Sequence, residues 1–364
     1  MEPLWVRDTW LLYFIVREDD IRQYEEGTLK GYRPWFVHQL FPEEVLYGYK
    51  DLEVHILYHI ASLTILSQVR YSLKDPNVEG FVDVESLLYE HFPGHVCSCM
   101  EDFKRRVTKP FHMNRYLSTW QVILPSQRLR SDTKVYMQNM NETTATEIYS
   151  QFKLLLLFYI ETASYIDWKD DRWDIFVLSS LHEDILGFAT VYRFNCFDRN
   201  ENKWSTKQRV RVAQFLIFPC FHGKSFGISL LDAIYRHYLE TDCMEINVES
   251  PCKAFQTMRD VIDTKNCLQL ERRLGYLPSV EEIRNEWKIT RKQAFRCREI
   301  VCFSRLQEEE VNAFRLQVKR RLYLEYGEQM ASLDSVAARK EYLWQLYEEI
   351  EETYRKVWKR VIEE

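Results

Sequence analysis

Alternating apolar and polar positions in the first 140 residues predict short strands. Leu52–Ile60 and Thr64–Leu73 are rich in β-branched and aromatic residues, and we expect them to pair around a turn at Ala61-Ser62. Val84–Tyr89 and Met100–Val107 have the character of short helices. This mixture predicts an α/β domain at the amino terminus.

Helical and strand patterns alternate from residue 141 to residue 276, which favours a mixed α/β sheet. The first helix is expected to be capped near Asn141 or Thr143. A hairpin turn is expected at His182-Glu183-Asp184, and a polar loop at Asp198–Ser205. The expected elements are the helix Glu147–Ile166, the strands Asp174–Ser179, Leu186–Phe197 and Lys207–Phe218, a helix carrying Leu230, Leu231, Ile234, Tyr235 and Tyr238, the strand Cys243–Glu249, and a helix that begins with Phe255–Val261.

The chain from residue 277 onward is charged and helical. Separate helices are predicted at Val280–Trp287, Arg291–Arg305 and Glu308–Tyr323. The tail Ala337–Glu364 carries an apolar face, which is typical of a helix that packs on the rest of the chain or on a partner. That face holds Tyr342, Leu343, Leu346, Tyr347 and Ile350. We therefore expect three parts, with bounds 1–140, 141–276 and 277–364.

Composition narrows the class of protein. Apolar residues make up 46% of the 364 residues, enough for a sizeable core, and no run reaches the roughly eighteen apolar residues of a membrane span. Nine cysteines without a repeating spacing predict a reducing, intracellular compartment. The net charge of −6 favours a cationic or neutral partner, because nucleic-acid binders are usually basic.

The segment Val210–Leu231 (VRVAQFLIFPCFHGKSFGISLL) carries the most chemical information. A strand rich in β-branched and aromatic residues ends at Pro219-Cys220, a loop with Gly223 and Gly227 follows, and a helix then begins. Loop amides and the positive end of a helix can hold a pyrophosphate, and glycine lets a ligand approach the backbone. An ordinary turn between a strand and a helix is the alternative interpretation.

This segment resembles the coenzyme A signature of the GNAT superfamily of N-acetyltransferases, Gln/Arg-x-x-Gly-x-Gly/Ala. The aligned loop is His222-Gly223-Lys224-Ser225-Phe226-Gly227. His222 replaces the first Gln or Arg, and Ser225 replaces the middle glycine, where its Cβ restricts the backbone torsion. The resemblance implies acetyl-CoA as cofactor, an α+β fold with a central mixed sheet, and a carboxy-terminal helical region.

A narrower resemblance is to the catalytic subunits of the type B histone acetyltransferases, and it covers roughly residues 36 to 326. It rests on several blocks that stand in the same order. These blocks are HQLF at 38–41, YGYKDL at 47–52, IETASYID at 160–167, DRW at 171–173, RVAQ at 211–214, ESP at 249–251, MRD at 258–260, KITRKQA at 288–294 and VKRRL at 318–322.

Acetyl transfer to lysine requires a neutral amine, whereas free lysine has a pKa of about 10.4. A carboxylate can remove that proton directly or through water. The family resemblance implies that Glu249 is the general base and that Glu161 shares the role. An aspartate usually follows the base in the family, but Ser250 stands here.

The resemblance also implies the residues that bind the cofactor and the substrate. The strand carrying Phe215 splays from its neighbour, and its backbone is expected to bond the pantetheine arm and polarise the thioester carbonyl. The expected cofactor residues are Phe215, Leu216, Ile217, His222, Gly223, Lys224, Ser225, Phe226, Gly227, Ile228 and Pro251.

An acidic and aromatic groove is expected for a Lys/Arg-rich histone tail. Its expected residues are Glu43, Glu44, Asp167, Asp170, Asp171, Trp173, Tyr192, Arg193 and Phe194, among which the cation Arg193 works against a basic peptide. Each acidic residue, taken singly, also fits an ordinary solvated surface position.

One cluster suggests a metal, because His91, His95, Cys97 and Cys99 stand together in HFPGHVCSC. Structural zinc sites usually draw their ligands from two separated pairs, and the corresponding family loop is not a metal site. We therefore expect an ordinary loop and no metal.

The first hypothesis is an active histone lysine acetyltransferase of nucleus and cytoplasm that modifies newly made core histones, chiefly the smallest, beside a WD-repeat histone-binding partner. The second is a diverged paralogue that binds histones or its partner but catalyses poorly, with His222, Ser225 and Ser250 as its support. The third is an acetyltransferase that acts on another protein amine.

Overall fold

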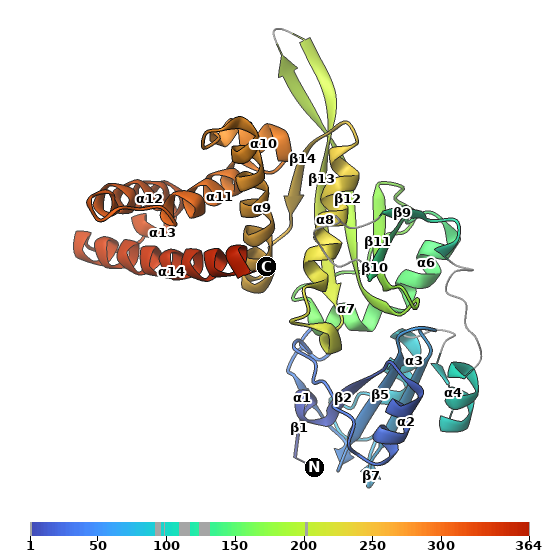
Figure 1. The fold of residues 1–364 in the computed structure, drawn as a ribbon. Coiled ribbons are helices and arrows are strands. Elements are labelled where there is room, and N and C mark those ends of the chain that lie inside the picture. Colours follow the sequence, from blue (N-terminus) through green and yellow to red (C-terminus); the bar gives the residue numbers. More distant parts are fainter. Residues whose placement is uncertain are drawn as a thin grey trace. The chain divides into compact units, whose positions relative to one another are not determined.

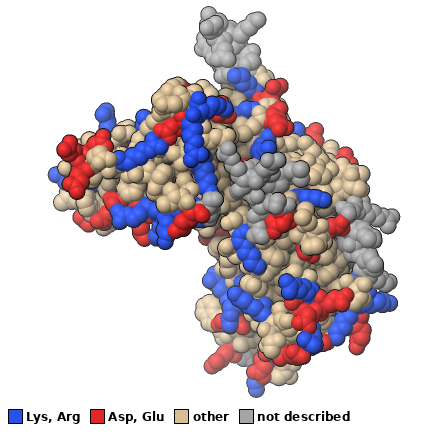
Figure 2. Space-filling view, in the orientation of Figure 1, with Lys and Arg blue, Asp and Glu red and all other residues tan. Residues whose placement is uncertain are grey.

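The structure is a computed structural model that describes residues 2–91, 96–97, 99–108, 117–123, 132–200 and 203–363, without the side chains of 198–200 and 203–205 (Figure 1). The chain divides into two compact units, Met1–His237 and Tyr238–Glu364. The three-part division made from the sequence stays a prediction. Basic and acidic side chains are interspersed over the face seen in Figure 2.

A four-stranded sheet forms the amino-terminal part of the first unit, in the order β2-β5-β6-β8. The expected pairing around Ala61-Ser62 is confirmed, because β5 and β6 are antiparallel and Tyr58 lies opposite Ile65. Strand β2 runs parallel to β5 and carries the buried residues Trp10, Leu12, Phe14 and Ile15. The strands of this sheet are β2 (Trp10–Ile15), β5 (Glu53–His59), β6 (Ile65–Arg70) and β8 (Val96–Cys97).

Helices and short strands complete this part of the unit. Helices α3 and α4 confirm the two helices expected there. The elements are β1 (Leu4–Trp5), α1 (Val6–Thr9), α2 (Glu18–Glu25), β3 (Val45–Leu46), β4 (Tyr49–Lys50), β7 (Leu73–Lys74), α3 (Val84–His91) and α4 (Met100–Val107).

An antiparallel sheet in the order β13-β12-β11-β10-β9 forms the rest of the first unit. The hairpin around His182-Glu183-Asp184 is confirmed, whereas the expected loop at Asp198–Ser205 is mostly wrong. The backbone ladder of the two strands continues to the pair Asn200 and Lys203. The strands are β9 (Gln121–Ile123), β10 (Thr133–Asn139), β11 (Trp173–Ser180), β12 (Ile185–Asn200) and β13 (Lys203–Ile217).

The single helix expected over Glu147–Ile166 is wrong. The chain instead forms α6 (Thr143–Ser150) and α7 (Lys153–Tyr159), and Ile160 is already extended. The side-chain amide of Gln39 donates to the carbonyl oxygens of residues 157 and 160 at 3.1 Å each. Because the last carbonyls of a helix have no partner within it, these bonds stabilise an end that the apolar pattern does not reveal.

Phe218 connects the two sheets of this unit. It is fully buried, follows β13 directly, and stacks on Phe14 of β2 with ring centroids 5.7 Å apart. Phe152 lies 5.9 Å from Phe218 and stacks on Phe188 of β12 at 4.3 Å. This aromatic cluster fixes the point at which the candidate cofactor loop leaves the sheet.

The second unit begins within α8 (Phe226–Leu239) and continues through one strand into helices. The predicted packing role of the tail is confirmed, because Tyr347, Tyr354, Val357 and Val361 join the buried cluster of this unit. Its further elements are β14 (Cys243–Val248), α9 (Lys253–Leu274), α10 (Val280–Trp287), α11 (Arg291–Phe303), the 3-10 turn η2 (Glu308–Glu310), α12 (Val311–Glu325), α13 (Gly327–Ala331) and α14 (Val336–Glu363).

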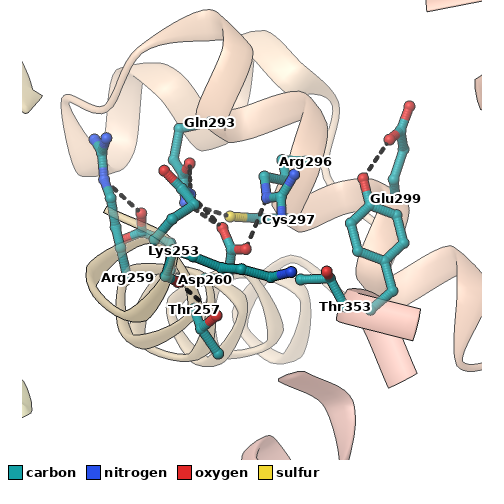
Figure 3. A network of polar contacts seen from close by, with 12 residues as sticks. Lys253, Thr257, Arg259, Asp260, Gln293, Arg296, Cys297, Glu299 and Thr353 are labelled. Atoms are coloured by element: carbon teal, nitrogen blue, oxygen red, sulfur yellow. Dashed lines mark hydrogen bonds and ion pairs between the residues drawn. The ribbon is translucent and has the colours of Figure 1, made fainter. Parts of the chain in front are cut away.

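Buried charges hold the helices of this unit together (Figure 3). Asp260 of α9 is fully buried, and one of its oxygens lies 2.7 Å from Arg296 Nε of α11. Its other oxygen accepts from the amides of Gln256 and Gln293, at 2.7 and 3.1 Å. Every carboxylate oxygen of Asp260 therefore has a partner, which a buried charge requires.

A second buried carboxylate joins three helices. Glu299 of α11 forms a two-bond ion pair with Arg321 of α12, at 2.9 and 2.8 Å. The Tyr354 hydroxyl of α14 donates to the same carboxylate at 2.6 Å. The Arg296 guanidinium also lies 5.4 Å from the centre of the Tyr354 ring, so the two networks are adjacent.

Asp260→Asn is expected to lower the free energy of unfolding by about 3 kcal/mol, because it leaves the largely buried Arg296 cation without its anion. Denaturant titration of the full chain measures the change, and amide exchange of α9 and α11 localises it. Glu352→Gln is the control: its carboxylate pairs with Lys356 on the exposed surface, so little change is expected. Equal effects of both variants would contradict a structural role for Asp260.

Candidate active site

The loop between β13 and α8 keeps the backbone of a glycine motif. After β13 the chain makes the 3-10 turn η1 (Pro219–Phe221), and Gly223 and Ser225 then have φ values of 76° and 60°. Both lie in the left-handed region that favours glycine, which costs a side-chain-bearing residue roughly 1–2 kcal/mol. Ser225 therefore holds a torsion that favours glycine, and its carbonyl accepts from the Ile228 amide at 3.1 Å.

These residues fit an anionic cofactor group such as a diphosphate. A side-chain carbon built on Gly223 would meet nothing within 4 Å, so the backbone there is open to an approaching ligand. Phe226 and Ile228 are buried and fix the first turn of α8, whose leading amides have no partner within the helix. Lys224 adds a cation on the exposed side of the loop.

The His222 side chain is directed at the protein's own strand. Its Nε2 donates to the carbonyl oxygen of Ile217, the last residue of β13, at 2.6 Å. The ring also lies 5.5 Å from that of Trp35, which is about half exposed. His222 thus joins the loop to the end of the strand, a contact that the sequence alone did not suggest.

The strand before the loop is buried and closely packed. Phe215, Leu216 and Ile217 lie opposite Ala189, Phe188 and Gly187 of β12. A side-chain carbon on Gly187 would stand 2.4 Å from the Leu216 carbonyl oxygen, so only glycine fits there. A register shift follows at Thr190, which makes Ala213 the extra residue of a bulge.

The two candidate bases belong to different units. Glu161 is exposed and lies in the first unit, directly after the extended Ile160. Glu249 is exposed, follows β14, and lies in the second unit with Pro251. Ser250, which stands where the family usually has an aspartate, has a positive φ of 37°.

Glu43 and Glu44 contact neighbours within the amino-terminal part. A Glu44 oxygen lies 3.4 Å from the Arg7 guanidinium and 4.0 Å from His38 Nδ1. Glu43 accepts a hydrogen bond from the Tyr47 hydroxyl at 3.3 Å. Arg7 therefore offsets part of the negative charge expected here.

The structure brings Trp173 and Tyr192 together. They lie opposite each other in β11 and β12, with ring centroids 4.7 Å apart. Asp170 accepts two hydrogen bonds from the Arg172 guanidinium at 2.8 Å, one from the Arg172 backbone amide at 3.1 Å and one from the Tyr192 hydroxyl at 3.3 Å. Hydrogen bonding from Arg172 lowers the pKa of Asp170 to about 2.

The Arg193 cation has an anion of its own. Its Nε lies 2.8 Å from a carboxylate oxygen of Asp174, which is almost fully buried. Because this pair cancels the charge, the expected conflict between Arg193 and a basic peptide is reduced. Phe194, the remaining aromatic residue of the predicted groove, lies under the Arg211 guanidinium at 5.4 Å from the ring centre.

The cluster His91, His95, Cys97 and Cys99 lies only partly in the described chain, because His95 falls outside it. Nδ1 of His91 lies 2.7 Å from the Tyr165 hydroxyl. Within the described residues no group of three or more His, Cys, Asp or Glu side chains could hold a metal ion. In the same part of the chain, no helix combines the length and apolarity of a membrane span.

Residues 9–161 match the family described as "Histone acetyl transferase HAT1 N-terminus". The histone acetyltransferase type B catalytic subunit of Rattus norvegicus is 28% identical, over 93% of this chain and 90% of the relative. The subunit of Homo sapiens is 27% identical with the same coverage, and that of Candida albicans is 25% identical over 90% of this chain and 84% of the relative.

Among solved structures, the xEco2 acetyltransferase domain bound to a K105-CoA conjugate aligns at 12% identity with a TM-score of 0.28, covering 43% of this chain and 93% of that chain. An alignment this weak carries no inference by itself. The antiparallel sheet, the loop with its left-handed residues and the helix that follows stand in the order expected for an N-acetyltransferase core. The chain is thus similar over nearly its whole length to type B histone acetyltransferase catalytic subunits, and its amino-terminal part matches the family model of such enzymes.

The low pKa of Asp170 predicts that its pairing with Arg172 survives acid. A depressed pKa contributes stability that is present above the ordinary value of 3.8 and is lost as pH falls through about 2. The carboxyl carbon resonance of Asp170 should therefore stay nearly constant from about pH 6 to about pH 3. In Arg172→Gln it should titrate near 3.8. Identical titrations in both proteins would contradict the pairing.

Proposed function

We propose that this chain is a histone lysine N-acetyltransferase that transfers the acetyl group of acetyl-CoA to lysine ε-amines of newly made core histones, chiefly the smallest. One observation carries the proposal. The similarity to named type B catalytic subunits spans 93% of this chain and 90% of the relative, and so crosses both compact units. The backbone of the loop at Gly223 and Ser225 supports it independently.

The cofactor residues would be those of the loop and of the strand before it. Backbone amides of 223–228 would hold the diphosphate, with Lys224 as a nearby cation. Backbone groups of Phe215, Leu216 and Ile217 would bind the pantetheine arm, and Pro251 is a further proposed cofactor residue. Acetyl-CoA, when bound, supplies the acetyl group as a thioester.

Glu249 is the proposed general base, and Glu161 shares this role. Because a free lysine amine is mostly protonated at neutral pH, a carboxylate must accept its proton before it can act as a nucleophile. Both glutamates are exposed, so each can receive that proton directly or through a water molecule. The proposed mechanism is direct attack of the neutral amine, without an acetylated side chain of this protein.

The proposed substrate groove combines aromatic surface with limited negative charge. Trp173 and Tyr192 offer adjoining rings, and Phe194 lies farther along β12. Glu43 and Glu44 are the acidic residues proposed for contacts with a basic tail. Since Arg172 and Arg193 pair with Asp170 and Asp174, recognition would depend on short-range contacts at least as much as on long-range attraction.

The proposed partners are core histone tails and a WD-repeat histone-binding protein, and the proposed locations are nucleus and cytoplasm. No disulfide joins the nine cysteines, all of which lie among the described residues, in keeping with a reducing compartment.

Glu249→Gln is expected to lower kcat for acetylation of a histone tail peptide about 100-fold or more, because it removes the base but keeps the shape. Glu161→Gln should lower kcat less, by about tenfold, if the two carboxylates share the proton transfer. Labelled acetyl-CoA and purified full chain provide the rate, and calorimetry should show unchanged cofactor binding. Glu240→Gln, an exposed glutamate before β14, is the matched control with unchanged kcat.

Ser225→Gly is expected to tighten acetyl-CoA binding severalfold, up to about tenfold, because glycine adopts the left-handed torsion without strain and leaves more room for the ligand. Calorimetric titration measures the affinity. Gly223→Ala provides the opposite change, since it introduces a Cβ at φ 76° and should weaken binding.

The second candidate function, a histone-binding paralogue with little catalysis, is favoured by Ser225 and Ser250. Tail binding without detectable cofactor binding in the unmodified chain would establish it over the first. Transfer to other proteins but not to histone tails would instead support an acetyltransferase with a different protein substrate.

A further inference from the structure

The side chain of Gln214 links the cofactor strand to the turn that carries Glu161. It lies in β13 directly after the bulge at Ala213 and one residue before Phe215, and it is only 6% exposed. Its amide nitrogen donates to the carbonyl oxygen of Ser164 at 2.7 Å. Its amide oxygen accepts from the hydroxyls of Tyr149 and Thr190, both at 3.2 Å.

Tyr149 extends this link to the far end of the same turn. Its hydroxyl accepts from the backbone amide of Ile166 at 3.2 Å while it donates to Gln214. Burial raises the pKa of Tyr149, so its hydroxyl stays protonated and remains a donor. The direction of every bond is fixed, because a carbonyl can only accept and a backbone amide can only donate.

The near end of the turn is held independently. Gln39 donates to the carbonyls of Leu157 and Ile160, and the Ala163 amide donates to the Ile160 carbonyl at 3.3 Å. Residues 160–166 are therefore anchored on both sides of Glu161. Thr162 within the turn has a φ of 58°, a strained value that needs such anchoring to persist.

Glu161 itself is exposed and makes no hydrogen bond or ion pair within the described residues. An unsupported exposed carboxylate has many rotamers, so the backbone beneath it must provide whatever positional accuracy it has. Gln214 belongs to the cofactor strand, and its buried side-chain amide bonds directly to the turn at Ser164.

We propose that Gln214, acting with Tyr149, is a positioning residue for acetyl transfer, because it fixes the Glu161 turn to the strand expected to bind the cofactor. This inference rests on the proposed function and adds to it a source of geometric accuracy. Small displacements of a reacting group lower rates strongly without changing affinity, so the effect should appear in kcat rather than in KM.

Tyr149→Phe tests the link with the smallest change, since it removes one hydroxyl and keeps the ring. We expect kcat for tail acetylation to fall about tenfold, with KM for acetyl-CoA within about twofold of the unmodified chain. Tyr58→Phe is the matched control, because it also removes a buried tyrosine hydroxyl, which in this case donates to the backbone carbonyl of Gln151 at 3.3 Å. It should leave kcat unchanged.

A double-mutant cycle with Glu161→Gln separates positioning from general stability. If Tyr149 acts through Glu161, Tyr149→Phe should change kcat by less than about twofold in the Glu161→Gln background. Gln214→Met should follow the pattern of Tyr149→Phe: it should lower kcat in the unmodified chain and change kcat little in the Glu161→Gln background. Amide exchange of residues 160–166 should accelerate in Tyr149→Phe and Gln214→Met but not in Tyr58→Phe.

Multiplicative losses in the cycle, unchanged exchange in the turn, or a Glu161→Gln variant with full activity would overturn the positioning role while leaving the proposed function intact. Absence of transfer by the unmodified chain would overturn the proposed function, and the positioning role with it. The two failures are therefore distinguishable.

Discussion

The aromatic cluster around Phe218 is the interaction on which the first unit depends. Phe218 is fully buried between Phe14 of the amino-terminal sheet and Phe152, which stacks on Phe188 of the second sheet. Aromatic burial of this kind contributes area and also a preferred geometry. Because Phe218 is the residue directly after β13, the packing that joins the two sheets also determines where the loop with Gly223 and Ser225 begins.

Polar contacts hold the helix ends of the first unit and join the helices of the second. The end of α7 is held by the amide of Gln39 and by the backbone amides of Trp35 and Phe36, which donate to the Phe158 carbonyl at 2.9 and 3.0 Å. In the second unit, the carboxylates of Asp260 and Glu299 join the helices through ion pairs, and the Gln293 amide adds a bond to Asp260. Buried charges are stable only when fully paired, so these contacts are specific to one arrangement of the helices.

Periodicity predicted most elements, because burial of one face leaves a repeat that can be read directly. The hairpin at His182-Glu183-Asp184, helix α10 and the packing face of α14 all follow from that repeat. The helix over Glu147–Ile166 was mispredicted because the bonds from Gln39 that end it come from residues more than a hundred positions away. Polar composition likewise suggested a loop at Asp198–Ser205, where the backbone ladder instead continues to Asn200 and Lys203.

The family resemblance predicts the site residues, but it does not predict their ion pairs and hydrogen bonds. Nothing in the sequence indicates that Arg193 pairs with Asp174, that His222 donates to Ile217, or that Gln214 reaches Ser164. Such contacts join residues that are distant in sequence and follow no period. They could be found only once the strands and turns that carry them had been placed.

Two positions near the loop differ in how freely they can change. At Ser225 a glycine-type torsion is held by a residue with a side chain, at a cost of roughly 1–2 kcal/mol that the rest of the fold can offset. At Gly187 the constraint is contact, since any side chain would collide with the backbone of β13. During divergence, Ser225 can therefore be exchanged and the conformation of the loop can change in small steps. Gly187, in contrast, cannot be replaced as long as β12 and β13 remain paired.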